Sequence, residues 1–187
     1  MWSPKFRPCP SRSQFDGIYP WRSLLNLSDS ANAYTLAASG GEKLPFDNSG
    51  NGASLVQPVT TASDVISAPL MLADNLSINN SSTLTLSGII SNGGAGKSIT
   101  KAGAGTLVLS VTNNYTGSTT LSAGTLSFNT IGNVDTAGSA LGAPSTADAG
   151  TINVSGILLY TPITISASAA LDVAGRTDQA LTLNRLG

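Results

Sequence analysis

Pairs of apolar residues separated by one small residue recur along the chain from Leu76 onward. This period of two is typical of a half-buried β-strand, because successive side chains of a strand point to opposite faces. The residue between the two apolar ones is polar in every pair but one, where it is Val108. The pattern predicts short strands whose inward face is aliphatic throughout, formed by Leu76 and Ile78, Leu84 and Leu86, Leu107 and Leu109, Leu126 and Phe128, Ile152 and Val154, Ile163 and Ile165, Leu171 and Val173, and Leu181 and Leu183.

A longer unit recurs over the same region, at intervals of about 20 to 25 residues, which is the length of one coil of a β-solenoid. One such coil cannot bury its aliphatic face alone, whereas stacked coils pair every backbone and place leucine over leucine. The connections between strands are too short to hold crossover helices. The unit begins at Ser82-Thr83-Leu84, Gly105-Thr106-Leu107, Gly124-Thr125-Leu126 and Gly150-Thr151-Ile152.

We therefore predict an all-β chain that forms a right-handed parallel β-helix of about six or seven coils over residues 30–187. The alternative is an antiparallel β-sandwich, which also uses short strands at regular spacing. Two-residue hairpin signals such as Asn51-Gly52 are too few to favour the sandwich.

Residues 1–29 differ in composition from the rest of the chain, because they combine aromatic and basic residues with several prolines. The prolines interrupt any apolar run that could serve as a signal peptide, so no export signal is expected here. The segment is predicted to be irregular. It is either a cap over the open end of the repeat array or, as the stronger interpretation, a truncated or misassigned and disordered beginning.

The composition removes most kinds of chemical site. Histidine is absent and Cys9 is the only cysteine, which excludes His-dependent triads, imidazole or thiolate metal sites and internal disulfides. A net charge of −1 without a long basic run makes nucleic acid an unexpected partner. The uncharged stretch 102–134 is too rich in Thr, Ser, Asn and Gly to be a membrane helix. We predict no catalytic residue, no metal site and no cofactor.

Residues 101–126 read KAGAGTLVLSVTNNYTGSTTLSAGTL. This segment closely resembles the autotransporter-associated β-strand repeat, also called the passenger-associated transport repeat. Val111 replaces the glycine that usually follows the first strand of that repeat, and Leu121 replaces the usual Ile or Val. Full agreement covers about residues 97–128, and looser agreement extends from Tyr34 to Leu183. The resemblance implies a parallel β-helix in a large exported bacterial surface protein, where such repeats assist passage or folding of the passenger.

Two interpretations of Tyr115-Thr116-Gly117 are open. In the favoured one, Gly117 allows a positive φ at a tight corner while Tyr115 covers the edge of the coil. In the other, Tyr115 is an aromatic platform that stacks on a sugar, although no second aromatic residue lies near it in the sequence.

Three further segments carry weak chemical signals. Residues 91–98 approach a phosphate-binding loop, but the first glycine is replaced by Ser91 and a strand pattern follows, so we expect a coil turn there. The same segment lacks the aspartate of a calcium-binding glycine-rich repeat. Asp172, Arg176 and Asp178 are the best enzyme candidate, but they are expected to be surface groups. Asn-x-Ser/Thr sequences are attributed to composition, and they begin at Asn26, Asn75, Asn79, Asn80, Asn114 and Asn153.

The leading functional prediction is a non-catalytic repeat segment of an exported bacterial surface protein or autotransporter passenger, located outside the cell or on its surface, that supports display and export-coupled folding. Its expected partners are other segments of the same or a larger passenger. The alternative is a β-helix that binds or degrades surface glycans. Neither prediction involves a transmembrane segment in this chain.

Overall fold

The computed structural model describes residues 13–15, 23–27, 32–58, 62–94, 96–131, 139–144, 152–154, 163–171 and 183–185. Side chains are described from residue 23 to residue 144 within these ranges, except at residue 131. Statements about the structure below refer to these residues alone.

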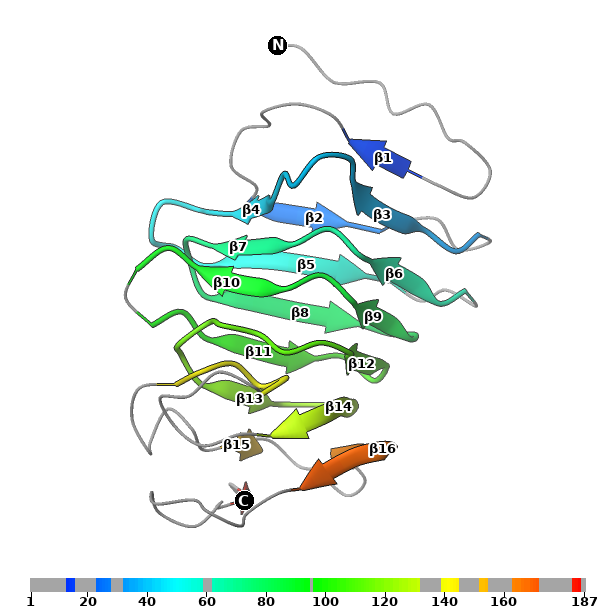
Figure 1. Cartoon of the computed structure of the whole chain (residues 1–187), viewed down its shortest axis with the longest axis vertical. Coiled ribbons are helices and arrows are strands. Elements are labelled where there is room, and N and C mark those ends of the chain that lie inside the picture. The colour runs from blue at the N-terminus through cyan, green and yellow to red at the C-terminus, as the bar shows by residue number, and fades with distance from the viewer. Residues whose placement is uncertain are drawn as a thin grey trace.

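The described chain winds through three faces, each of which is a parallel β-sheet. One sheet of seven strands has the order β1-β3-β6-β9-β12-β14-β16, the opposite sheet of seven has the order β17-β15-β13-β11-β8-β5-β2, and a sheet of three strands has the order β10-β7-β4. We call them sheets A, C and B. In Figure 1 the strands lie across the long axis and follow one another down the stack from the blue to the orange end of the chain.

Every strand pair is parallel and joins strands from successive coils, so the predicted β-solenoid is confirmed and the antiparallel sandwich is wrong. The described strands are β1 Ser13–Phe15, β2 Leu24–Asn26, β3 Thr35–Ala38, β4 Leu44–Phe46, β5 Ala53–Gln57, β6 Asp64–Ile66, β7 Leu70–Leu72, β8 Leu76–Asn80, β9 Leu84–Leu86, β10 Ile90–Asn92, β11 Ile99–Ala102, β12 Thr106–Leu109, β13 Thr119–Leu121, β14 Thr125–Ile131, β15 Ile152–Val154, β16 Ile163–Leu171 and β17 Leu183–Arg185.

The inward residues of successive coils form aliphatic columns. In sheet A, Leu84 pairs in register with Leu107, and Leu107 pairs with Leu126. All three side chains are fully buried. Complete burial of one such side chain is worth about 1.5–3 kcal/mol, so the columns stabilise the stack as a whole although no single coil has a core. The inward pairs predicted for β8, β9, β12 and β14 are thereby confirmed.

Sheet B explains the position of Pro45. Proline has no backbone N–H to donate, and it is therefore tolerated mainly in edge strands. Pro45 is the central residue of β4, and β4 is the edge strand of sheet B.

The number of complete coils is smaller than predicted. Only three strands form sheet B, and in the following coil its place is taken by residues 110–118, which are not a strand. We call residues 110–118 the third-face segment. All three faces are therefore present for about four turns, fewer than the six or seven coils expected, although the two long sheets have seven strands each. The two long sheets continue through β15, β16 and β17.

The prediction of an inward face that is aliphatic throughout is wrong. Fully or almost fully buried polar residues interrupt the columns, and four of them belong to one corner of the solenoid. A buried polar group is tolerated only where it finds hydrogen-bond partners. The buried polar residues are Gln57, Asp64, Asp74, Asn80, Lys101, Asn113, Thr119 and Ser139.

Within the predicted irregular segment 1–29, β1 pairs with β3 and β2 pairs with β5. The other residues of that segment lie outside the described ranges, apart from Ser23 and Leu27. A domain boundary at residue 29 stays a prediction. No described residue belongs to a helix that is long and apolar enough to cross a membrane.

Candidate functional site

The corner between sheets C and A is bridged from inside the solenoid by polar side chains. Gln57 and Asn80 end β5 and β8, pair in register, and are fully buried. The Gln57 amide donates to the backbone carbonyl of Thr83 at 3.1 Å, and the Asn80 amide donates to that of Thr106 at 2.9 Å. Each amide thus binds the backbone of the following coil, so these side chains couple one coil to the next.

A buried carboxylate completes the first of these corners. The Gln57 amide donates to Oδ2 of Asp64 at 2.7 Å, while the backbone N–H of Tyr34 donates to Oδ1 at 2.7 Å. Asp64 begins β6 at an inward position. It pairs in register with Leu84, so the same position in the next coil holds a leucine. The hydrogen bond from Tyr34 connects residues 30 positions apart in the chain.

Lys101 serves the same corner in the coil of the repeat. It occupies an inward position of β11, in register with Ile78 and Leu121, and it is fully buried. Its ammonium donates to the carbonyl oxygens of Ala102 at 2.7 Å, Gly103 at 2.8 Å and Ala123 at 3.1 Å. Burial lowers the pKa of Lys101 to about 8.

Two glycines shape the carbonyl cluster around this ammonium. Gly103 and Gly124 have φ of 79° and 75°, which an L side chain rarely adopts. A Cβ on Gly124 would lie 2.4 Å from the carbonyl oxygen of Gly103 and 2.8 Å from Nζ of Lys101. Glycine is therefore required at the corner by both its conformation and the close approach of the ammonium.

Asn113 takes the place of a strand where sheet B ends. Its side-chain oxygen accepts the backbone N–H of Ile90 at 2.7 Å, and its amide donates to the carbonyl of Ala140 at 2.7 Å. The next backbone N–H, of Asn114, donates to the carbonyl of Ile90 at 2.9 Å. The free edge of β10 is therefore closed by a side chain and a short piece of backbone.

Tyr115 is a core residue. Its side chain is fully buried, and its hydroxyl lies 2.7 Å from the hydroxyl of Thr119. Burial raises the pKa of the Tyr115 phenol above its usual range. The interpretation of Tyr115 as a sugar-stacking platform is wrong, because no face of the ring is accessible.

Gly117 is required for a different reason from the one expected. It is not among the residues with positive φ. A Cβ at this position would lie 2.4 Å from the backbone carbonyl carbon and oxygen of Lys97. The close approach of two coils, and not a left-handed corner, makes glycine necessary there.

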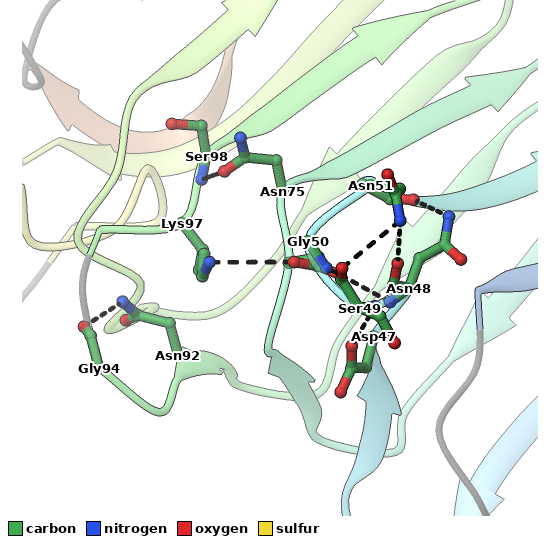
Figure 2. A network of polar contacts seen from close by, with 12 residues as sticks. Asp47, Asn48, Ser49, Gly50, Asn51, Asn75, Asn92, Gly94, Lys97 and Ser98 are labelled. Carbon is green, nitrogen blue, oxygen red and sulfur yellow. Dashed lines mark hydrogen bonds and ion pairs between the residues drawn. The ribbon is translucent and has the colours of Figure 1, made fainter.

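A second polar network lies on the turn between β4 and β5 (Figure 2). The Asp74 carboxylate accepts the backbone N–H groups of Asn48 at 2.6 Å and Gly50 at 3.0 Å, which belong to the preceding coil. Lys97 of the following coil approaches the same carboxylate at 3.9 Å. The hydrogen bond from Asn48 is the main cause that lowers the pKa of Asp74, and Gly50 and Lys97 lower it further against the opposing effect of burial.

The phosphate-loop candidate, residues 91–98, runs from β10 to β11, as a coil turn would. Its Lys97 serves the network around Asp74. Asp172, Arg176, Asp178 and Cys9 lie outside the described residues. Asn80 is buried, whereas Asn26, Asn75, Asn79 and Asn114 are exposed. In the described part of the chain, no group of three His, Cys, Asp or Glu residues could hold a metal.

Sequence reasoning missed the roles of Gln57, Asn80, Lys101 and Asn113. A usable signal was present in part, because Lys101 follows Ile99 at the two-residue spacing of an inward position. The alternation alone could not show that a lysine at such a position is buried, since the ordinary expectation is an exposed charge.

Comparison with known proteins agrees with this geometry. The family model described as passenger-associated-transport-repeat matches residues 99–128. No curated protein and no solved structure matches the chain. The matched residues cover β11, β12, the third-face segment, β13 and the start of β14, and they contain Lys101, Asn113 and Tyr115. The chain therefore carries a passenger-associated transport repeat at residues 99–128, built into a parallel β-solenoid.

Proposed function

We propose that the chain is a non-catalytic structural segment of an exported bacterial surface protein or autotransporter passenger, and that it supports display and export-coupled folding. It acts outside the cell or on its surface, with other segments of the same or a larger passenger as its partners. The observation that carries the proposal is that Lys101 and Asn113 of the repeat point inward and join successive coils.

The direction of these contacts supports a mechanical role. Lys101 bonds to a carbonyl 22 residues further along the chain, and Asn113 bonds to one 27 residues further along. Each coil therefore presents side-chain hydrogen-bond donors to the backbone of the next coil, in addition to the edge of its strands. A chain that emerges gradually from a membrane can fold onto such a template one coil at a time, because each new coil contacts only its neighbours.

The test uses the full chain fused to an export signal and an outer-membrane barrel in a Gram-negative host. The surface-exposed fraction is measured by antibody labelling of intact cells. Folding is measured by resistance to proteinase K, because the chain has no Lys or Arg for trypsin between Lys101 and Arg176. Asn113→Ala, which disrupts the repeat, should lower the folded surface fraction. The exposed neighbouring variant Asn114→Ala should behave like the parent chain.

Equal export and equal proteinase K resistance for a chain in which residues 99–128 are replaced by a Gly/Ser linker would contradict the proposal. Activity is tested separately with purified protein, by a reducing-sugar assay against bacterial and host glycans. Turnover by the purified chain would contradict the non-catalytic assignment.

A further inference from the structure

The Lys101 ammonium is held inside the solenoid by backbone oxygens alone. Its neighbours in the same column, Ile78 and Leu121, are aliphatic, so a leucine or methionine would match the packing of the column. A buried ammonium carries a large desolvation cost unless its protons are all accepted. Here three carbonyl oxygens accept them, and no described carboxylate lies within ion-pair distance.

The three oxygens come from two consecutive corners. Ala102 and Gly103 turn the chain from β11 into β12, and Ala123 lies at the equivalent corner between β13 and β14. The left-handed glycines Gly103 and Gly124 bring these corners close together, since a Cβ on Gly124 would meet the carbonyl oxygens of both Gly103 and Gly105 at 2.4 Å. Carbonyl oxygens that converge in this way concentrate negative potential, which attracts a cation and offsets part of the cost of burying its charge.

The preceding coil provides an internal comparison. At its corner the neutral amide of Asn80 donates to the carbonyls of Ser82 at 2.7 Å and Thr106 at 2.9 Å. The turn that follows Asn80 in its own coil, residues 81–83, contains no glycine, whereas the Lys101 ammonium contacts the corners of both Gly103 and Gly124. The charged side chain, Lys101, thus lies beside two glycines with positive φ, whereas the neutral side chain, Asn80, is followed by a turn without one.

We propose that the carbonyl oxygens of Ala102, Gly103 and Ala123 form a monovalent-cation site between two coils, and that the Lys101 ammonium is its tethered ligand. The distances of 2.7–3.1 Å from Nζ to the oxygens suit an ammonium or potassium ion. When Lys101 is shortened to alanine, the site accepts a free ion of this class, which restores the contact between the coils.

The experiment measures the Tm of the purified full chain by circular dichroism, in choline chloride at constant ionic strength, with stepwise replacement by ammonium, potassium or methylammonium chloride. Lys101→Ala is expected to be less stable than the parent in choline and to show a saturable rise in Tm of about 2–4 °C with ammonium or potassium. The parent chain and Lys101→Met should show no such rise, because Nζ or the methionine side chain fills the site.

Two matched variants exclude simpler explanations. Asn80→Ala truncates the equivalent neutral corner and should not respond to the ions beyond the parent, which separates a cation site from a general salt effect. Lys101→Met keeps most of the volume without the charge, and it should melt below the parent at neutral pH. A Lys101→Met chain as stable as the parent would overturn the proposal.

An equal response of all variants to the ions, or no response of Lys101→Ala, would also overturn it. If Lys101→Ala is unfolded in choline, refolding in ammonium counts as the expected response and its absence as the contrary one. These measurements use purified protein, so their failure leaves the proposed export role unaffected.

Discussion

The side-chain oxygen of Asn113 accepts the backbone N–H of Ile90 at 2.7 Å, although the two residues are 23 positions apart in the chain. This contact stands where the next strand of sheet B would pair with β10. An unpaired strand edge is a template for association with another chain, and a side chain that occupies it removes that risk.

Asn113→Ala should lower the free energy of unfolding by about 1–3 kcal/mol, because it leaves the N–H of Ile90 and the carbonyl of Ala140 without their partner in the interior. Urea unfolding followed by circular dichroism measures the change. Asn114→Ala is the matched control at an exposed position, and it should stay within about 0.5 kcal/mol of the parent. A similar loss of unfolding free energy in both variants would show that the contacts of Asn113 do not contribute specifically to stability.

Gly117→Ala should be strongly destabilising, by about 1–3 kcal/mol, since the added methyl group would lie 2.4 Å from the backbone of Lys97 and force two coils apart. Gly94→Ala is the matched control, because a Cβ there meets nothing within 4 Å. Its stability should be unchanged or slightly higher, owing to the loss of unfolded-state entropy. The Tm values of the two variants, measured side by side, check the prediction, which fails if Gly117→Ala melts with the parent.

The depressed pKa of Lys101 predicts a rise in stability at alkaline pH. The unfolded chain keeps this lysine protonated up to about pH 10.5, whereas the folded chain releases the proton near pH 8. Between these values the unfolded state binds more protons, so the contribution of Lys101 to the free energy of unfolding increases with pH. The measurement is the difference in urea midpoint between the parent and Lys101→Met from pH 7 to 10.5, in which the effects of the other groups cancel. A difference that is constant across this range would contradict the assignment.

The lowered pKa of Asp74 predicts a loss of stability in acid, with the same sign of pH dependence as for Lys101. Its contribution to stability is complete above the unfolded-state pKa, near 3.8, and is lost as the pH falls through the lower pKa of the folded state. Asp74→Asn should therefore reduce the fall in Tm between pH 5 and pH 2. Asp47→Asn is the comparison in the same network, since Asp47 accepts a hydrogen bond within the exposed turn, from the N–H of Ser49 at 2.7 Å. An acid profile for Asp74→Asn that matches the parent would disprove the role of this carboxylate.

The sheet classes and the inward aliphatic pairs could be predicted from the chain itself, because the alternation of Leu76 and Ile78 or of Leu107 and Leu109 depends only on the geometry of a strand. The glycine at Gly124 was also visible as part of the repeating Gly-Thr-Leu unit. The number of coils was overestimated, since periodicity shows where strands occur and does not show where the third sheet ends.

The sequence by itself indicated a β-solenoid, through its local periodicity and spacing, and its resemblance to the passenger-associated transport repeat indicated the family. Only the tertiary structure decided that Lys101 and Asn113 lie inside and that Tyr115 belongs to the core. Their partners are backbone groups from neighbouring coils about 20 to 30 residues away. A polar side chain is stable in the interior only when stacking brings those groups to it, and no pattern within a single coil records that event.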